Sequence, residues 1–506
     1  MTPDLIDDAT RKRAAGRGGF LPGIVLGLVF GLCVIFISGE ETRFAVYGLG
    51  ALLALAALPP ILRRVGSVER LLFIALVLSL QFDVAVAYRF REFKPAGAYG
   101  ILVSPMLIAA AALVVLRALI SVRGLGRRFW IDWRFVRWVA LLFLAGVMST
   151  VNTSDRQLVS FGLFEILTIG LIAVAAADEC GTRDGLRVVQ RMLGWTVIIQ
   201  SLLIIISFST GVQISLSHGV RGDDYGWAQV HRFAGTLNTP SAAGTMLVVC
   251  LIGALTRIYQ DVGSRERSWL YLQLGLGSFA LLLTQTRTAW IGFILGGVGV
   301  LVAAVRRGEL RAGRLIGLAG GAVMALLCAW PFIANRVEAN HSDDWDVRWR
   351  LIVIAREMIK AHPFAGIGLN TGTNQVYAYA ARAGAEGWVF IVHNQFLLAW
   401  AEMGILGILA TIWLFRIALQ AASKLKRSPD PELRNAGLWL FWSLIALIWA
   451  LNMDHVAGAP TYKLVFFVFG VAVGAARLVT AADEVTSKTP PGAVPPPERT
   501  RASAAA

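Results

Sequence analysis

The chain has 506 residues, of which 56% are hydrophobic and only 16% are charged. This composition is too apolar for a soluble domain and is typical of a protein that crosses a membrane many times. The net charge of +15 could suggest a nucleic-acid partner, but the basic residues gather in short loops between apolar runs. We therefore exclude nucleic acid and expect an all-α, polytopic integral membrane protein.

The first predicted element is a basic segment, residues 1–19, ahead of the first apolar run. A cleaved signal peptide is the alternative, but the run is long, lacks a clear cleavage site and is followed by further runs, which favours a retained helix. About fourteen runs are long enough to span a bilayer. The third is the weakest, because Gln81 and Asp83 interrupt it. The runs are 20–38, 44–62, 71–88, 100–116, 138–152, 158–178, 192–208, 241–256, 269–283, 288–305, 315–333, 394–415, 435–452 and 460–476.

The short loops between the runs carry unequal charge. The six loops that alternate onto one side hold 24 Lys and Arg residues, and the five on the other side hold 7. Loops rich in Lys and Arg remain cytoplasmic, so both chain termini are expected in the cytoplasm. The positive charge is thus a topology signal first and a contact with membrane lipids second. None of the 4 cysteines falls in an outer loop, so we expect no structural disulfide and no metal cluster.

A single membrane domain is expected over residues 20–482, with long outer loops at 209–239 and 334–392. The tail, residues 483–506, is rich in Pro, Ala and Ser, and this composition predicts a disordered cytoplasmic segment. The second outer loop is too long for a bare connector, so it should contain structure of its own.

A helix is predicted inside the second outer loop. Asp346 could cap a helix from Val347 to about Ala361. Residues at positions i, i+4, i+7 and i+11 give it one apolar face, so it would lie on the membrane surface or cover a cavity. Asp343 and Asp344 could bind a divalent cation with Asp346, but a solvated helix start is favoured because the spacing is not that of a calcium loop. The apolar face consists of Val347, Leu351, Ile354 and Met358.

Four polar clusters face the outer side in this topology. Each lies at the edge of an apolar run, where ionisable groups are costly unless they are paired or hydrated. They are therefore candidate functional sites. The clusters cover residues 231–240, 284–290, 348–368 and 393–404.

Two arginines in these clusters could bind an anion. Arg287 stands between two apolar runs that are separated by very few residues. A guanidinium is always charged and presents forked donors that suit phosphate oxygens. The alternative is an interfacial arginine that reaches lipid headgroups. Arg232 offers the same choice, with an ordinary loop arginine as its alternative.

His393 stands at the mouth of an apolar run and could act as a general base. A reference pKa of about 6.5 leaves most of an imidazole neutral at pH 7. The alternative is an interfacial His bonded to a backbone carbonyl. Asn394, Leu398 and Glu402 share one helix face by their spacing, and His393 lies roughly a hundred degrees away from Asn394. Glu402 is therefore expected to brace a neighbouring helix rather than bind the His.

Over residues 230–410 the chain resembles the O-antigen ligase and O-antigen polymerase superfamily, which includes exopolysaccharide polymerases. The first 200 residues resemble it only in hydropathy. The resemblance rests on the order and spacing of motifs that are weak individually. These motifs are Arg232-x-x-Gly235-Thr236-x-Asn238, Thr286-Arg287-Thr288-Ala289-Trp290, the Arg348 helix with His362-Pro363 and Gly366-Ile367-Gly368, and His393-Asn394 with Glu402-Met403-Gly404.

The resemblance implies a glycosyltransferase of the C type (GT-C) in a bacterial inner membrane. Such an enzyme takes a glycan from an undecaprenyl diphosphate carrier on the periplasmic side, without a nucleotide sugar, metal or cofactor. Carried over to matching positions, Arg232 and Arg287 would hold the diphosphate, and Arg348 would belong to a mobile loop over the site. His393 would accept the proton of the acceptor hydroxyl, or orient that hydroxyl. The other motif residues expected to bind substrate are Asn238, Asn394 and Glu402.

Three functions remain open. A polymerase would join lipid-linked repeat units, and a ligase would move the glycan onto lipid A–core; the high number of spans favours a polymerase. A partner that regulates chain length is compatible with the first. A transporter of lipid-linked oligosaccharides is the alternative from another class, but transporters show paired repeats and polar groups at the membrane midplane, whereas here the polar motifs gather at one boundary. A non-catalytic scaffold would not explain why Arg287 and His393 occupy energetically costly positions beside apolar runs.

Overall fold

The computed structural model describes most of the chain from residue 65 onward. Contacts divide the chain into residues 1–71, of which only 65–71 are described, and residues 72–506, which hold the elements discussed below. The predicted runs 20–38 and 44–62, Asn238 and almost all of run 315–333 lie outside the described residues. These are 65–82, 85–88, 98–153, 155–213, 232–237, 239–258, 260, 262–308, 330, 334, 343–384, 391–453 and 460–488.

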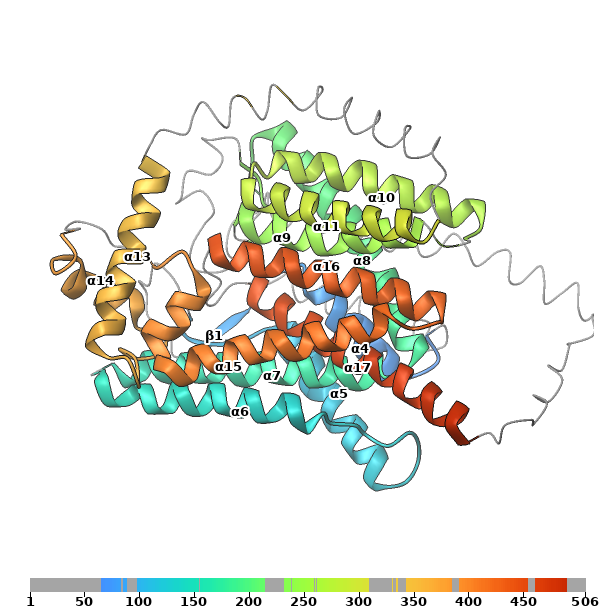
Figure 1. Cartoon of the computed structure of the whole chain (residues 1–506), viewed down its shortest axis with the longest axis horizontal. Helices are drawn as coiled ribbons and strands as arrows, with labels where there is room; N and C mark the ends of the chain where they lie inside the picture. The colour runs from blue at the N-terminus through green and yellow to red at the C-terminus, as the bar shows by residue number, and fades with distance from the viewer. Residues whose placement is uncertain are drawn as a thin grey trace, which may run out of the picture. The chain divides into compact units, whose positions relative to one another are not determined.

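Nine of the described helices are long and apolar enough to cross a membrane, which confirms a helical, multi-pass membrane protein (Figure 1). A further helix, α10 (Ser264–Leu283), covers predicted run 269–283 but begins with charged residues. The last helix extends to Lys488, into the predicted tail. The nine comprise α5 (Pro105–Val122), α6 (Trp133–Met148, extended by η1, Ser149–Asn152), α7 (Arg156–Cys180), α8 (Arg183–Thr210), α9 (Pro240–Ile258), α11 (Arg287–Arg306), α15 (Gln395–Lys426), α16 (Pro431–Met453) and α17 (Pro460–Lys488).

The third predicted span, 71–88, is wrong. Helix α4 (Val68–Ser79) has 12 residues, too few for the ~20 that a bilayer requires. Beyond it, β1 (Val86–Tyr88) pairs antiparallel with β2 (Ile101–Val103), a small departure from an all-α fold. The helix ends just before Gln81, whose backbone carbonyl accepts hydrogen bonds from side chains of other segments.

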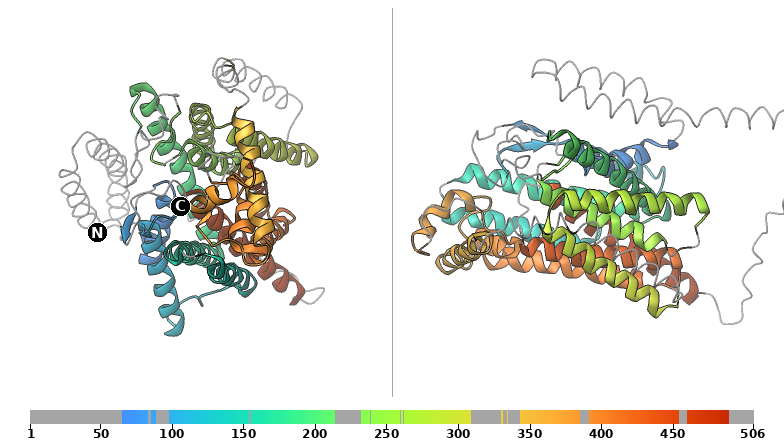
Figure 2. Two further views of the ribbon diagram at one scale, coloured as in Figure 1. Left: turned by 90° about the vertical axis from the view of Figure 1, so that its left-hand side faces the viewer. Right: turned by 90° about the horizontal axis from the view of Figure 1, so that it is seen from above.

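Glycines set the closest helix contact. A Cβ atom at Gly470 of α17 would lie 2.2 Å from the carbonyl oxygen of Ala173 on α7, and one at Gly474 would lie 2.2 Å from that of Ala177. Small residues spaced four apart let two helix backbones approach closely where lipid offers no hydrophobic driving force. Helices α8, α9, α15 and α16 also contact α17 in the bundle (Figure 2).

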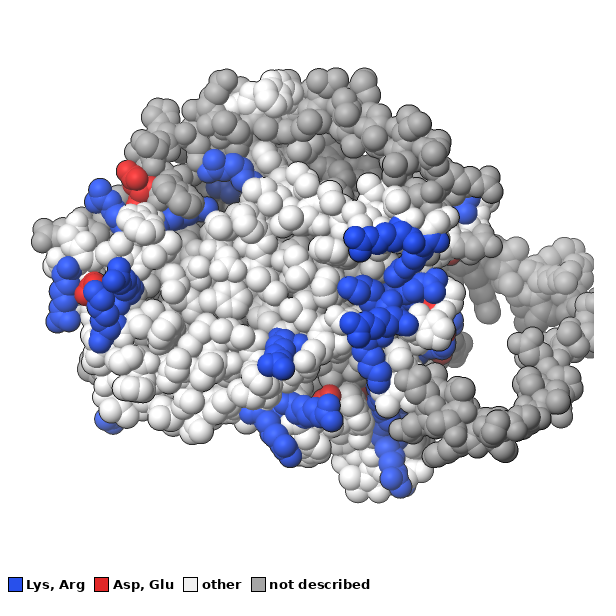
Figure 3. Space-filling view, in the orientation of Figure 1, with Lys and Arg blue, Asp and Glu red and all other residues white. Residues whose placement is uncertain are grey.

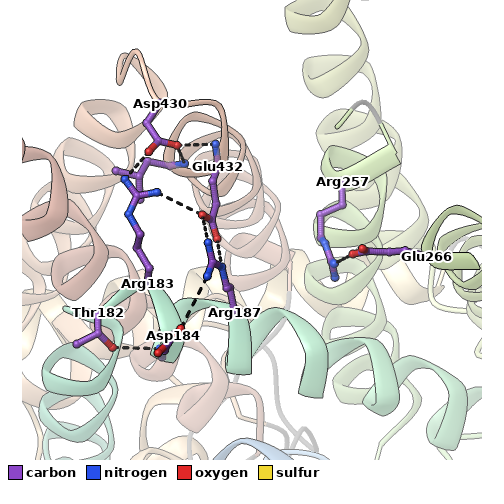
Figure 4. Close-up of polar contacts among 10 residues, drawn as sticks. Thr182, Arg183, Asp184, Arg187, Arg257, Glu266, Asp430 and Glu432 are labelled. Atoms are coloured by element: carbon purple, nitrogen blue, oxygen red, sulfur yellow. Dashed lines mark hydrogen bonds and ion pairs between the residues drawn. The ribbon is translucent and has the colours of Figure 1, made fainter. Parts of the chain in front are cut away.

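Charged side chains separate the two ends of the bundle. On the face drawn in Figure 3, Lys and Arg gather mainly at the end away from α13 and α14, and a largely uncharged band lies between. At the basic end, Arg183 and Arg187 of α8 bind Asp430 and Glu432 at the start of α16 (Figure 4). Arg187 donates from Nε to Glu432 Oε1 at 2.7 Å and from Nη2 to Oε2 at 2.8 Å. This forked pair fixes α8 against α16.

Candidate functional site

The first motif forms a turn that presents Arg232 beside α8. The backbone N–H of Thr236 donates to Gln200 Oε1 at 3.3 Å, and its hydroxyl donates to the Gln81 carbonyl at 2.6 Å. Gly235 has φ +60°, and a Cβ there would lie 2.3 Å from Gln200 Oε1. Only glycine fits this close, left-handed position. The turn is therefore fixed by buried amide groups, and Arg232 is half-buried at its start.

The second motif forms the tight turn between α10 and α11. Gln285 has φ 49°, and α11 begins at Arg287 without a capping bond from the Thr286 side chain. The first backbone N–H groups of a helix attract anions, and the half-buried guanidinium of Arg287 lies at the same place. A Cβ at Gly244 of α9 would lie 2.8 Å from Ala289 Cβ. The Arg287 turn thus packs against α9, which follows the Arg232 turn.

The start of α15 meets these elements through the end of α16. Thr245 of α9, Thr288 of α11 and Ala450 of α16 line one small cavity. Two residues further along α16, the carbonyl of Asn452 accepts a hydrogen bond from Asn394 Nδ2 at 3.2 Å. The starts of α9, α11 and α15 therefore meet the end of α16. This arrangement brings Arg287 and His393 to the same end of the bundle.

His393 directly precedes the cap of α15. Asn394 Oδ1 accepts hydrogen bonds from the backbone N–H of Phe396 at 3.1 Å and of Leu397 at 3.0 Å. His393 Nδ1 lies 2.7 Å from the carbonyl oxygen of Ile391, the kind of backbone bond that the alternative of an interfacial His predicted. Because a carbonyl only accepts, this bond assigns the ring proton to Nδ1. The neutral imidazole then carries its lone pair on Nε2, the arrangement that a general base requires.

Helix α15 is not the unbroken helix expected over residues 394–415. Gly404 has φ 68° and ψ −165°, which interrupts the helix. The ring centroids of Phe396 and Phe415 lie 5.7 Å apart, whereas nineteen residues of straight helix would separate them by roughly 28 Å. A short arm, residues 395–403, therefore folds back along a long arm, residues 405–426.

Exchanged backbone hydrogen bonds hold this elbow. In a straight helix the carbonyl of Ala401 would accept from the N–H of Ile405. Here it accepts from Ile367 N at 2.9 Å, and Ile405 N donates to the Pro363 carbonyl at 3.0 Å. The His362–Gly368 motif thus supplies the groups that Gly404 disconnects. Two motifs of the resemblance, far apart in sequence, form one structural latch.

Glu402 is part of the same latch. Its side chain is 4% exposed. Oε2 accepts from the backbone N–H of Asn370 and Oε1 from that of Gly372, both at 2.9 Å. The expectation of a bracing role thus matches the geometry, although the braced element is the loop at 366–372 rather than a helix. Its predicted contact with substrate has no counterpart among these bonds.

The helix predicted in the long outer loop is α13 (Asp343–Ala361), which begins before the expected Val347. Its apolar face is buried with residues of α14 (Gly372–Ala380) and of the α15 short arm. The membrane-surface alternative for this face is therefore wrong. Arg348 is half-buried on α13, and α13 and α14 lie together at one end of the long helices (Figures 1 and 2). The buried cluster contains Leu351, Ile354, Met358, Ile367, Val376, Tyr379, Ala380 and Ala401.

Several positioning residues escaped the sequence analysis. Gln200 and Asn452 sit inside apolar runs, and polar residues in such runs are the signal that could have found them. Asn370 adopts φ 62° and donates from Nδ2 to the carbonyls of Ala98 at 2.7 Å and Leu158 at 2.9 Å. Nothing local in the sequence indicates such long-range contacts.

Residues 272–412 match the family model described as O-antigen ligase. Over this stretch the chain is similar to the O-antigen ligase family. The resemblance inferred from the motifs is therefore confirmed, and it supports a function of the O-antigen ligase or polymerase type. No curated protein matches the chain. The O-antigen ligase domain contains Arg287, Arg348, His393, Asn394 and Glu402, and it begins after Arg232.

Proposed function

We propose that the protein is a metal-independent glycosyltransferase of the C type in a bacterial inner membrane. Its donor is a glycan on undecaprenyl diphosphate, and its site faces the periplasm. One observation carries this proposal. His393, whose ring is oriented by the Ile391 carbonyl, and the helix start at Arg287 lie at the same end of the bundle, and both fall within the stretch that matches the O-antigen ligase model. The Lys and Arg residues that gather where α15 ends support a cytoplasmic C-terminus. A cytoplasmic N-terminus stays a prediction, because run 71–88 does not span and the earlier runs lie outside the described residues.

The proposed reaction needs three tasks. A sugar C1–diphosphate bond is already activated, so catalysis requires stabilisation of leaving-group charge, an aligned hydroxyl and a proton acceptor. Arg287 and Arg232 bind the diphosphate oxygens, and Arg348 closes over the site with α13. His393 Nε2 accepts the proton as the acceptor oxygen forms its bond to C1. The C1–oxygen bond of the carrier breaks, and undecaprenyl diphosphate leaves with the electron pair.

In-line attack would invert the configuration at C1. Asn394 and Glu402 act as positioning residues in this scheme, because their side chains bind the protein backbone. Asn238 remains a predicted substrate contact outside the described residues. Finding the transferred linkage in the same configuration as the donor bond would contradict the in-line scheme.

For the acceptor, we infer a second lipid-linked repeat unit and hence a polymerase, on the basis of the number of predicted spans, which falls from fourteen to thirteen without run 71–88. The ligase alternative would use lipid A–core. A polymerase would also accommodate a partner that regulates chain length. The transporter alternative would translocate the lipid-linked oligosaccharide without forming a new bond.

The test uses purified protein in nanodiscs with a lipid-diphosphate-linked repeat unit and neither nucleotide sugar nor added metal. Wild type is compared with His393→Ala and Arg287→Ala by mass spectrometry of the products. Arg356→Ala and Lys360→Ala are matched controls, because both basic side chains are exposed on α13. We expect a product ladder that the first two changes reduce at least ~100-fold, as for loss of a base or a charge-stabilising donor, and that the controls preserve.

Other outcomes discriminate the alternatives. Transfer that appears only with lipid A–core would identify a ligase. Translocation in vesicles without any transfer would refute the enzyme and favour a transporter. A ladder that survives His393→Ala at full rate would refute the assignment of the base.

A further inference from the structure

A groove of about 820 Å³ runs along the long arm of α15 between α16 and α17. It is away from the Arg287 turn and contains none of the proposed catalytic residues. Its volume is within the range of sites that bind ligands. The lining residues are Phe396, Ile412, Phe415, Arg416, Leu419, Gln420, Ser423, Lys424, Arg427, Ser428, Pro429, Ile448 and Val479.

The groove has one polar wall and one apolar wall. Arg416, Gln420, Lys424 and Arg427 follow i, i+4, i+8 and i+11 on the long arm of α15, so they share a helix face. The remaining lining residues are mostly aromatic or aliphatic, and none of the described side chains that line the groove is acidic. This combination suits an amphiphile that has an anionic headgroup and a hydrocarbon chain.

Arg416 places a positive charge in the groove that requires an anion or access to the membrane interface. Its guanidinium is exposed within a helix that qualifies as a membrane span and lies 4.4 Å from the centroid of the Trp413 ring. A charge exposed to hydrocarbon is costly unless it reaches an anion or the interface. Lys424 Nζ donates to the neutral Thr480 Oγ1 at 2.6 Å, and among the side chains that the structure describes it has no acidic partner.

We propose that this groove binds an anionic glycerophospholipid of the cytoplasmic leaflet. The phosphate lies along the stripe from Arg416 to Arg427, and an acyl chain packs against Phe415 and Ile448. The cytoplasmic leaflet is favoured because α15 ends at its basic residues, Lys424 and Lys426, on the side that the charge rule places in the cytoplasm. The start of α15 reaches the groove only at its apolar end, where Phe396 lies against Phe415, whereas the stripe extends from Arg416 toward the basic end of the long arm. A diphosphate bound by Arg287 would therefore leave Lys424 and Arg427 without an anion.

The test measures which lipid the groove holds. Full-length protein in nanodiscs of phosphatidylcholine is given a photoactivatable phosphatidylglycerol, and cross-linked peptides are mapped by mass spectrometry. We expect adducts concentrated in residues 412–429. Competition by unlabelled phosphatidylglycerol, and not by phosphatidylcholine, should remove them. Adducts spread over all lipid-facing helices, or an equal effect of both competitors, would overturn the proposal.

A charge-matched pair of variants makes the test independent of net charge. The groove variant carries Arg416→Gln, Lys424→Gln and Arg427→Gln. The control variant removes three exposed arginines from α6 and the end of α5, with the substitutions Arg123→Gln, Arg134→Gln and Arg137→Gln. Each basic residue near an anionic surface contributes roughly fivefold to affinity, so the groove variant should lose ~100-fold in phosphatidylglycerol binding.

The control variant should keep the wild-type binding and cross-linking pattern. Equal losses in both variants would show a general surface-charge effect and overturn the site. Transfer activity distinguishes this proposal from the proposed function, because the three basic residues removed from the groove are not among the residues proposed to act in transfer. A groove variant that binds no phosphatidylglycerol but still extends glycans supports both, whereas saturable cross-linking by the lipid-diphosphate carrier at 412–429 would assign the groove to the donor instead.

Discussion

Replacing Gly404 by alanine tests whether the elbow of α15 positions the site. Its backbone, with φ 68° and ψ −165°, occupies a region that is essentially restricted to glycine. A Cβ atom there would lie 2.0 Å from the carbonyl oxygen of Phe364 and 2.7 Å from the backbone nitrogen of Ala365. Both neighbours are backbone atoms that cannot rotate away. The elbow must therefore open or the loop must move.

The expected cost follows from these contacts. The strained backbone contributes about 1–3 kcal/mol. Opening the elbow also removes the bonds from Ile367 N to the Ala401 carbonyl and from Ile405 N to the Pro363 carbonyl, each worth ~1 kcal/mol. Together Gly404→Ala should destabilise the protein by about 3–5 kcal/mol. Because the short arm carries His393, transfer activity should also fall in the fraction that remains folded.

The assay is thermal or denaturant unfolding in detergent, followed by tryptophan fluorescence. Gly384→Ala is the matched control, because Gly384 has φ +63° with nothing within 4 Å of an added Cβ. Left-handed strain alone should cost that variant about 1 kcal/mol. If the two variants were equally stable and equally active, the elbow would not depend on the close approach at Gly404, and our account of the latch would be refuted.

Three further predictions concern the polar contacts. Glu402→Gln keeps the side-chain shape but removes its charge, so it should lower stability by about 1.5–3 kcal/mol, measured by unfolding; no change would contradict the bracing role. Asn394→Asp keeps the cap of α15 but loses the donor to Asn452, so transfer should fall while the melting temperature changes little; unaltered transfer would show that this bond does not orient the site. Burial opposes ionisation of Asp430, but the Arg183 guanidinium and backbone N–H groups at the start of α16 hold its pKa below the ordinary 3.8. Its stabilising effect is thus complete above about pH 4 and is lost as the pH falls below that value. Acid unfolding of Asp430→Asn should show a stability deficit at pH 7 that disappears near pH 3, and a deficit independent of pH would refute the ionic origin.

The sequence predicted the helices because each long apolar run must satisfy its own backbone hydrogen bonds in a membrane. It failed at run 71–88, where hydropathy remains high but α4 ends at Ser79. Hydropathy reports the polarity of the surroundings, and a short buried helix followed by a strand has the same polarity as a span. The interruption by Gln81 was the visible signal of this difference.

The sequence predicted which residues belong to the candidate site, but it did not predict how they are arranged in space. The motifs identified Arg287 and His393 by the cost of placing such groups beside apolar runs. They did not reveal that Gly404 reverses the helix, since one glycine in an apolar run is usually tolerated. The reversal depends on the Pro363 and Ile367 backbone groups, which lie more than thirty residues earlier. Contacts of that range leave no periodic signature in a single sequence.

The elbow also explains why the motif at residues 393–404 contains residues with different roles. Because the short arm folds back, His393 lies at the ends of α9, α11 and α16 rather than on the loop that carries α13. A guanidinium–phosphate contact is stronger in such a partly desolvated place than in open water. Backbone that leaves a helix at this depth must find other partners, and the latch from 363 to 368 provides them. The Gly404 and Glu402 positions therefore control where the proposed base lies, although neither needs to contact the substrate.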